Sequence, residues 1–154
     1  MKRLFVSFIA VAILLSLTGY SNVQAKGKKV KNDYRAELGS KMLSSSGKTK
    51  AKGYAIFKFS KDGKKLFYRL YVYDIDSVSM AHIHHGPFGK EGPIVVWLYK
   101  GKITGKFNGL LAKGIITDKD TNLNTLRKWM DAGDTYVLVH TQKFPNGEIG
   151  GIIR

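Results

Sequence analysis

The sequence has 154 residues, with 26 Lys and Arg against 11 Asp and Glu, which gives a formal net charge of +15. This length suits one ordinary domain and excludes a full α/β barrel or a nucleotide-binding enzyme with a separate substrate domain. The chain has no Cys, which also excludes a disulfide framework, a thiolate nucleophile and a Cys-based metal site.

The N-terminus has the three parts of a secretory signal peptide. Lys2 and Arg3 precede an apolar run over residues 4–17, and Val23-Gln24-Ala25 places small residues at the cleavage positions. This pattern predicts a signal peptide over residues 1–25, cleaved after Ala25. An uncleaved membrane anchor is the alternative, but the run is shorter than the roughly 20 residues that span a bilayer. We therefore expect a secreted or cell-envelope protein.

A basic segment follows. Residues 26–33 are predicted to form a flexible leader, and residues 26–52 carry only Asp33 and Glu37 against nine basic residues: Lys26, Lys28, Lys29, Lys31, Arg35, Lys41, Lys48, Lys50 and Lys52. This charge favours attachment to an anionic cell-wall polymer or a membrane surface, and a solvated tail is the alternative. Nucleic acid is not an expected partner, because the chain is exported and has no basic-aromatic recognition motif.

Alternation of apolar and polar residues predicts eight short strands. In residues 53–60, for example, Ala55, Phe57 and Phe59 fall on one face. The following Lys61-Asp62-Gly63-Lys64 predicts a hairpin turn, because Gly tolerates a positive φ. The predicted strands are residues 33–43, 53–60, 65–74, 80–85, 94–99, 102–110, 135–141 and 148–153.

Residues 120–133 have helical spacing instead. The apolar positions that recur at this spacing are Leu123, Leu126 and Met130. Asp120 or Thr121 is expected to cap the start, and Gly133 to end the helix. These elements predict an all-β fold, an antiparallel β-sandwich with one short crossover helix. Trp97 and Trp129 are expected to anchor its core.

The histidines are the chemically distinctive residues. His82 and His84 are two apart on a predicted strand and therefore project to the same face, whereas His85 projects to the other. His140 lies near the end of the strand predicted over 135–141. If the two strands are neighbours, His82, His84 and His140 converge into a site suited to copper or zinc. The alternative is that these imidazoles hydrogen-bond the backbone of Gly-rich turns.

Catalytic motifs are absent from the sequence. No Ser lies in a nucleophile-elbow motif, and Gly86-Pro87-Phe88-Gly89 lacks the Lys and Ser or Thr of a phosphate-binding loop. Acidic partners for a histidine are present but form no repeated motif: Asp74, Asp76, Asp131, Asp134 and Glu148. These observations favour a protein that is not an enzyme.

The histidines lie within two pairs of longer motifs. The first pair comprises AHIHHGP at 81–87 and GPIVVWL at 92–98, and the second comprises AGDTYVLVHT at 132–141 and FPNGEIGG at 144–151. These motif pairs resemble the CHRD (chordin-type) domain family. The resemblance covers about residues 34–154 and implies one domain over that range. It also implies an immunoglobulin-like sandwich in a secreted or surface protein. Growth-factor binding is not implied, because the other modules of chordin are missing.

A weaker similarity, to Cu/Zn superoxide dismutases, involves the same histidines. By motif position, His82, His84 and His140 would correspond to three copper ligands, which implies a superoxide-dismutase-like sandwich. No His lies between His85 and His140 to bridge to a zinc ion, and the disulfide Cys and the substrate-steering Arg are missing. Dismutase activity is therefore not expected.

Two interpretations follow. The leading one is an exported CHRD-domain protein that acts as a non-enzymatic binding or structural module at the cell surface. The other is a copper- or zinc-binding protein that uses His82, His84 and His140.

Overall fold

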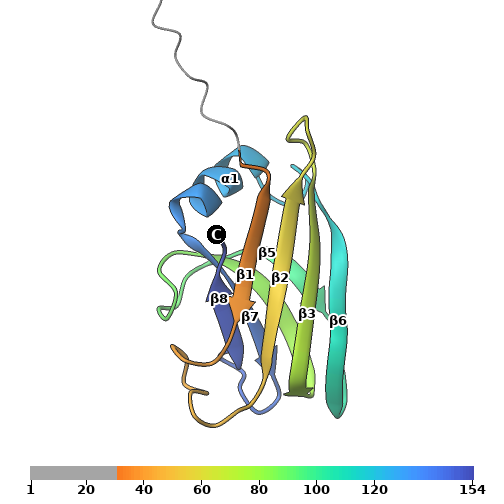
Figure 1. Ribbon diagram of the computed structural model, residues 1–154, viewed down its shortest axis with the longest axis vertical. Coiled ribbons are helices and arrows are strands. Elements are labelled where there is room, and N and C mark those ends of the chain that lie inside the picture. The colour runs from red at the N-terminus through yellow and green to blue at the C-terminus, as the bar shows by residue number, and fades with distance from the viewer. Residues whose placement is uncertain (1–30) are drawn as a thin grey trace, which may run out of the picture.

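The computed structural model describes residues 31–154, which form two packed antiparallel sheets and one helix (Figure 1). The strand orders are β1-β2-β3-β6 and β5-β4-β7-β8, which confirms the predicted antiparallel β-sandwich with one crossover helix. The elements are β1 (Asp33–Leu38), β2 (Lys52–Phe59), β3 (Leu66–Asp76), β4 (Val78–His85), β5 (Ile94–Lys100), β6 (Lys106–Ile116), α1 (Leu123–Ala132), β7 (Thr135–Thr141) and β8 (Ile149–Ile152).

Most of the predictions for the N-terminus concern residues that the structure does not describe. The signal peptide predicted over 1–25 and residues 26–30 of the leader lie outside the described residues. Within residues 31–154, no helix is long and apolar enough to cross a membrane.

The core lies between the two sheets, as the alternation requires. Ala55, Phe57 and Phe59 of β2 are buried, and Ala81 and Ile83 of β4 belong to the same core cluster. Since successive side chains of a strand point to opposite faces, the neighbours of Ala81 and Ile83 in β4 face outward from the sandwich. This geometry decides where the histidines lie.

The predicted helix is present but begins later than expected. Its N-cap is Asn122, whose side chain accepts a hydrogen bond from the Thr125 backbone N–H, in place of Asp120 or Thr121. Asp120 instead accepts hydrogen bonds from Thr117 in the preceding turn. Gly133 ends the helix at φ 76°, as predicted, because a left-handed residue favours glycine.

Two predicted strands have boundaries that differ from the structure by four residues or more. The first strand ends at Leu38 rather than at residue 43, because residues 40–48 fold into local turns. The strand predicted over 102–110 is β6, Lys106–Ile116. A bulge in its pairing with β3, where Leu70 pairs with Ala112 and Tyr71 with Leu110, breaks the strict alternation at the residue where the predicted strand ended. Residues 102–105 precede β6.

Candidate metal centre

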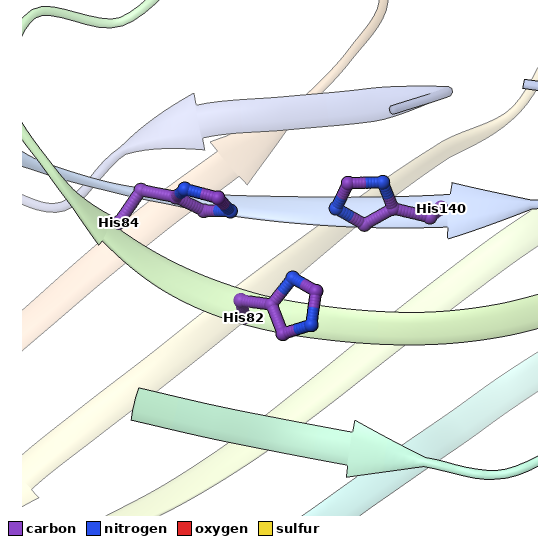
Figure 2. A group of neighbouring side chains, drawn as sticks. All are labelled: His82, His84 and His140. Carbon is purple, nitrogen blue, oxygen red and sulfur yellow. The ribbon is translucent and has the colours of Figure 1, made fainter. Parts of the chain in front are cut away.

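Three histidines converge on the outer face of the β5-β4-β7-β8 sheet. His82 and His84 alternate on β4 with the core residue Ile83, and His140 comes from β7, which pairs with β4. Figure 2 shows the three rings grouped over these two neighbouring strands. Their candidate ligand nitrogens all lie within 4.8 Å of one another. The predicted shared face of His82 and His84 and the convergence with His140 are therefore present.

The three rings are unusually well buried for side chains on an outer face. The exposed fractions of His82, His84 and His140 are 1%, 6% and 7%. Their ring centroids lie 5.0 Å apart for His82 and His140, 5.5 Å for His82 and His84, and 6.3 Å for His84 and His140. Water is largely kept from the rings, and each nitrogen must therefore find a partner within the site or remain unsatisfied.

Backbone carbonyls fix the orientation of two of the rings. His84 Nδ1 lies 2.8 Å from the Gly92 carbonyl oxygen, and His140 Nδ1 lies 2.8 Å from that of Pro145. A carbonyl oxygen only accepts, so Nδ1–H is the donor in both rings. In a neutral imidazole this tautomer leaves a lone pair on Nε2, which is the usual arrangement in metal-ligating histidines.

The remaining ring nitrogens have no hydrogen-bond partner among the described residues. These atoms are Nε2 of His84, Nε2 of His140 and both nitrogens of His82. A buried polar atom without a partner is destabilising by about 1–3 kcal/mol. The hydrogen bonds to turn backbone expected in the alternative interpretation are present for His84 and His140, but they leave four ring nitrogens of the cluster without a partner.

The environment favours the neutral form of two of the rings. Burial, followed by the nearby His140 and His84 rings, lowers the pKa of His82 from 6.5 to about 4. Burial also lowers the pKa of His140, and its hydrogen bond to Pro145 partly opposes that shift. At neutral pH both rings are therefore unprotonated, which is the form that binds a metal ion.

Aromatic side chains enclose the cluster. Tyr136 of β7 stacks on His84, with ring centroids 5.0 Å apart, and Trp97 of β5 packs edge-on against His82 at 4.1 Å. The ammonium group of Lys100 lies over the Trp97 ring, 4.1 Å from its centroid. The prediction that Trp97 anchors the core was wrong: it is 45% exposed, because it lies on the site face of β5, opposite His82 in the register.

Tyr136 also holds the loop that orients His84. Its hydroxyl accepts from the Gly92 backbone N–H at 3.1 Å and donates to the Lys90 carbonyl oxygen at 2.9 Å. A Cβ at Gly92 would come within 2.1 Å of the His85 carbonyl oxygen, so only glycine fits there. The sequence prediction did not single out Tyr136, although its place four residues before His140, on the same face of a strand, was a usable signal.

His85 lies apart from the cluster, as its position in the alternation predicts. Its ring stacks on Trp129 of α1, with centroids 4.0 Å apart, and Trp129 packs against the edge of the core. The acidic residues considered as partners do not reach the site either. Glu148, for example, accepts hydrogen bonds from Thr49 and Thr141. Within residues 31–154, the partners of the site rings are backbone carbonyls.

A comparison with protein families agrees with the motifs. The family model of the CHRD domain matches residues 34–153, which is nearly all of the described chain. No curated protein matches the sequence. The paired motifs around His82 and His140 both lie inside the matched range, in the two strands that form the site. The chain belongs to the CHRD domain family.

Proposed function

We propose that His82, His84 and His140 hold one copper or zinc ion and that the protein is a non-enzymatic metal-binding domain. The observation that carries this proposal is the set of buried ring nitrogens that lack a partner and lie within 4.8 Å of one another. Three imidazoles on adjacent strands are a common ligand set for either metal. CHRD membership is compatible with this role but does not specify it.

Met80 favours copper over zinc. It lies opposite His140 in the pairing of β4 with β7, and it precedes His82 by two residues on the same face of β4. Directly paired residues on adjacent strands have Cα atoms about 4.5–5.5 Å apart, a range that a methionine side chain spans easily. A thioether is a soft ligand that suits Cu(I), whereas zinc sites in proteins are built from thiolate, imidazole and carboxylate ligands.

Calorimetric titration of the metal-stripped protein at pH 7.5 tests the site. We expect saturable binding of one ion per chain, lost in His140→Ala and retained in the matched control His85→Ala, whose ring is outside the cluster. No saturable binding of copper or zinc, or equal loss in both variants, would refute the three-histidine site.

The choice of metal has its own experiment. Met80→Leu keeps the size of the side chain and removes the sulfur, so we expect weaker Cu(I) binding, measured by competition with a chromogenic chelator, and unchanged zinc binding. If Cu(I) affinity is unchanged in Met80→Leu, Met80 is not a ligand, and the three-histidine site is judged by the preceding titration.

We also propose that the protein works outside the cell, secreted or in the cell envelope, as a surface-associated module. The signal peptide predicted over residues 1–25 and the basic residues of 26–52 support this. Mass spectrometry of the exported protein should find Lys26 at its N-terminus. An intact Met1 on exported material would contradict cleavage.

A further inference from the structure

A row of cations crosses the outer face of the β1-β2-β3-β6 sheet, on the far side of the sandwich from the histidines. In the register, Arg35 of β1 lies opposite Ile56 of β2, Ile56 opposite Arg69 of β3, and Arg69 opposite Lys113 of β6. Arg154 extends the row, because its backbone exchanges two hydrogen bonds with Arg35 beyond the edge of the sheet. We call Arg154, Arg35, Arg69 and Lys113 the cationic row.

This arrangement is electrostatically unfavourable for the isolated protein. Two pairs in the row, Arg35 with Arg154 and Arg69 with Lys113, place like charges directly opposite each other, which destabilises a sheet. Within residues 31–154, the ion pairs join Arg35 to Glu37 and Lys58 to Asp33. Arg69, Lys113 and Arg154 thus have no carboxylate partner in the described part of the chain.

The row lies in a groove that also offers apolar contacts. The groove has a volume of about 880 Å³ and includes the four residues of the row. Phe67 and Ile115, which are paired on β3 and β6 and both exposed, line it beside Arg69 and Lys113. With strands about 4.8 Å apart, the row from Lys113 to Arg154 extends over roughly 19 Å.

We propose that this groove binds a linear acidic polysaccharide that lies across the strands. A chain of sugar acids presents carboxylates in a line, which the row can bind through charge-assisted hydrogen bonds, bidentate at arginine. The apolar C–H faces of the sugar rings would pack on Ile56, Phe67 and Ile115. A groove admits a single polymer chain, whereas a flat bilayer would meet only its rim. The polymer and the metal therefore use opposite sheets.

The experiment measures binding of polygalacturonate to the full mature chain. Arg69→Gln with Lys113→Gln removes two cations from the row, and we expect the affinity to fall at least about tenfold. The matched control, Lys119→Gln with Lys128→Gln, removes two exposed cations outside the groove and should lower the affinity less than about threefold at 0.15 M salt. Equal loss in both double variants would mean that net charge alone drives binding, and would overturn the proposal.

Two further probes separate other anions from the polysaccharide. Phe67→Ser should weaken binding of polygalacturonate and leave binding of inorganic polyphosphate unchanged, because only the sugar offers an apolar face. Vesicles containing phosphatidylglycerol should bind more weakly than polygalacturonate. Stronger binding to the vesicles, or no binding of polygalacturonate, would refute the polysaccharide assignment. Circular dichroism of each variant checks that it is folded.

Discussion

Ile83 illustrates how a single residue can serve both the core and the site. Its side chain is fully buried between the sheets, while His82 and His84 on either side of it point the other way. The alternation of β4 thus ties the packing of the sandwich to the placement of the two ligands. A change of register by one residue would turn both histidines into the core.

Replacing Ile83 by Asp should therefore destabilise the fold strongly. A carboxylate would be buried without a partner, and we expect the free energy of unfolding to fall by about 4 kcal/mol or more. Chemical denaturation measures this loss. Ile115→Asp is the control, because Ile115 is 51% exposed and its substitution should change the free energy by no more than about 0.5 kcal/mol. Similar midpoints for the two variants would contradict the assigned faces.

At the scale of single residues, the sequence predicted the features of the site that local alternation determines, and it missed those that depend on tertiary contacts. Period-two alternation correctly put His82 and His84 together and His85 apart. Trp97 was expected in the core for a different reason, because large aromatic side chains usually anchor a core. In the structure Trp97 covers His82 instead, and that pairing depends on which strand lies beside β4.

At the scale of elements, the site depends on the pairing of β4 with β7 and on the loop between β4 and β5. From the sequence, the pairing of β4 with β7 could be stated only as a condition for the site. More than fifty residues separate His84 from His140, and strand pairing over that distance is not a local property. The β4–β5 loop, residues 86–93, is fixed by Tyr136, whose hydroxyl bonds Gly92 and Lys90.

Tyr136→Phe tests the role of that loop. It keeps the ring stacked on His84 and removes two hydrogen bonds, so we expect a loss of about 1–3 kcal/mol in the free energy of unfolding. Because the Gly92 carbonyl then orients His84 less firmly, metal affinity should fall by roughly 10-fold or more. Thermal melting and metal titration measure the two effects. Thr117→Val, at a hydroxyl far from the loop, provides the comparison. A Tyr136→Phe variant with unchanged metal affinity would show that the loop does not position the ligand.

At the scale of the whole molecule, the sandwich has two outer faces with different character. One is the buried three-histidine cluster beneath aromatic side chains, and the other is the cationic row with its apolar flanks. The fold class followed from the short alternating segments and their turns. The strand order did not follow from the sequence, because the alternation within a strand shows which of its faces is buried but not which strands lie beside it. The bulge that interrupts the alternation of β6 after Leu110 was hidden for the same reason.

The buried histidines make the stability of the metal-free fold depend on pH. The folded pKa of His82 is about 4, below its unfolded value of about 6.5. The unfolded chain therefore binds more protons between these values, and stability present above pH 6.5 is lost as the pH falls towards 4. His140 shifts in the same direction. We expect the free energy of unfolding to fall with a slope of up to about 1.4 kcal/mol per pH unit from His82 alone.

Urea denaturation of the metal-free protein between pH 7.5 and 4.5 measures that slope. The slope should be shallower in His82→Phe, because phenylalanine cannot be protonated. Carboxylates elsewhere contribute equally to the slopes of the wild-type protein and the variant. Equal slopes would contradict the neutral, buried state assigned to His82.

The central claim is that three imidazoles from β4 and β7 bind one metal ion. Its most direct test is a crystal structure of the copper-loaded mature protein, with the ion located by anomalous scattering at the copper edge. We predict one ion per chain, about 2.0–2.1 Å from a ring nitrogen of each of His82, His84 and His140. A copper ion held elsewhere, or by fewer than these three rings, would contradict the claim.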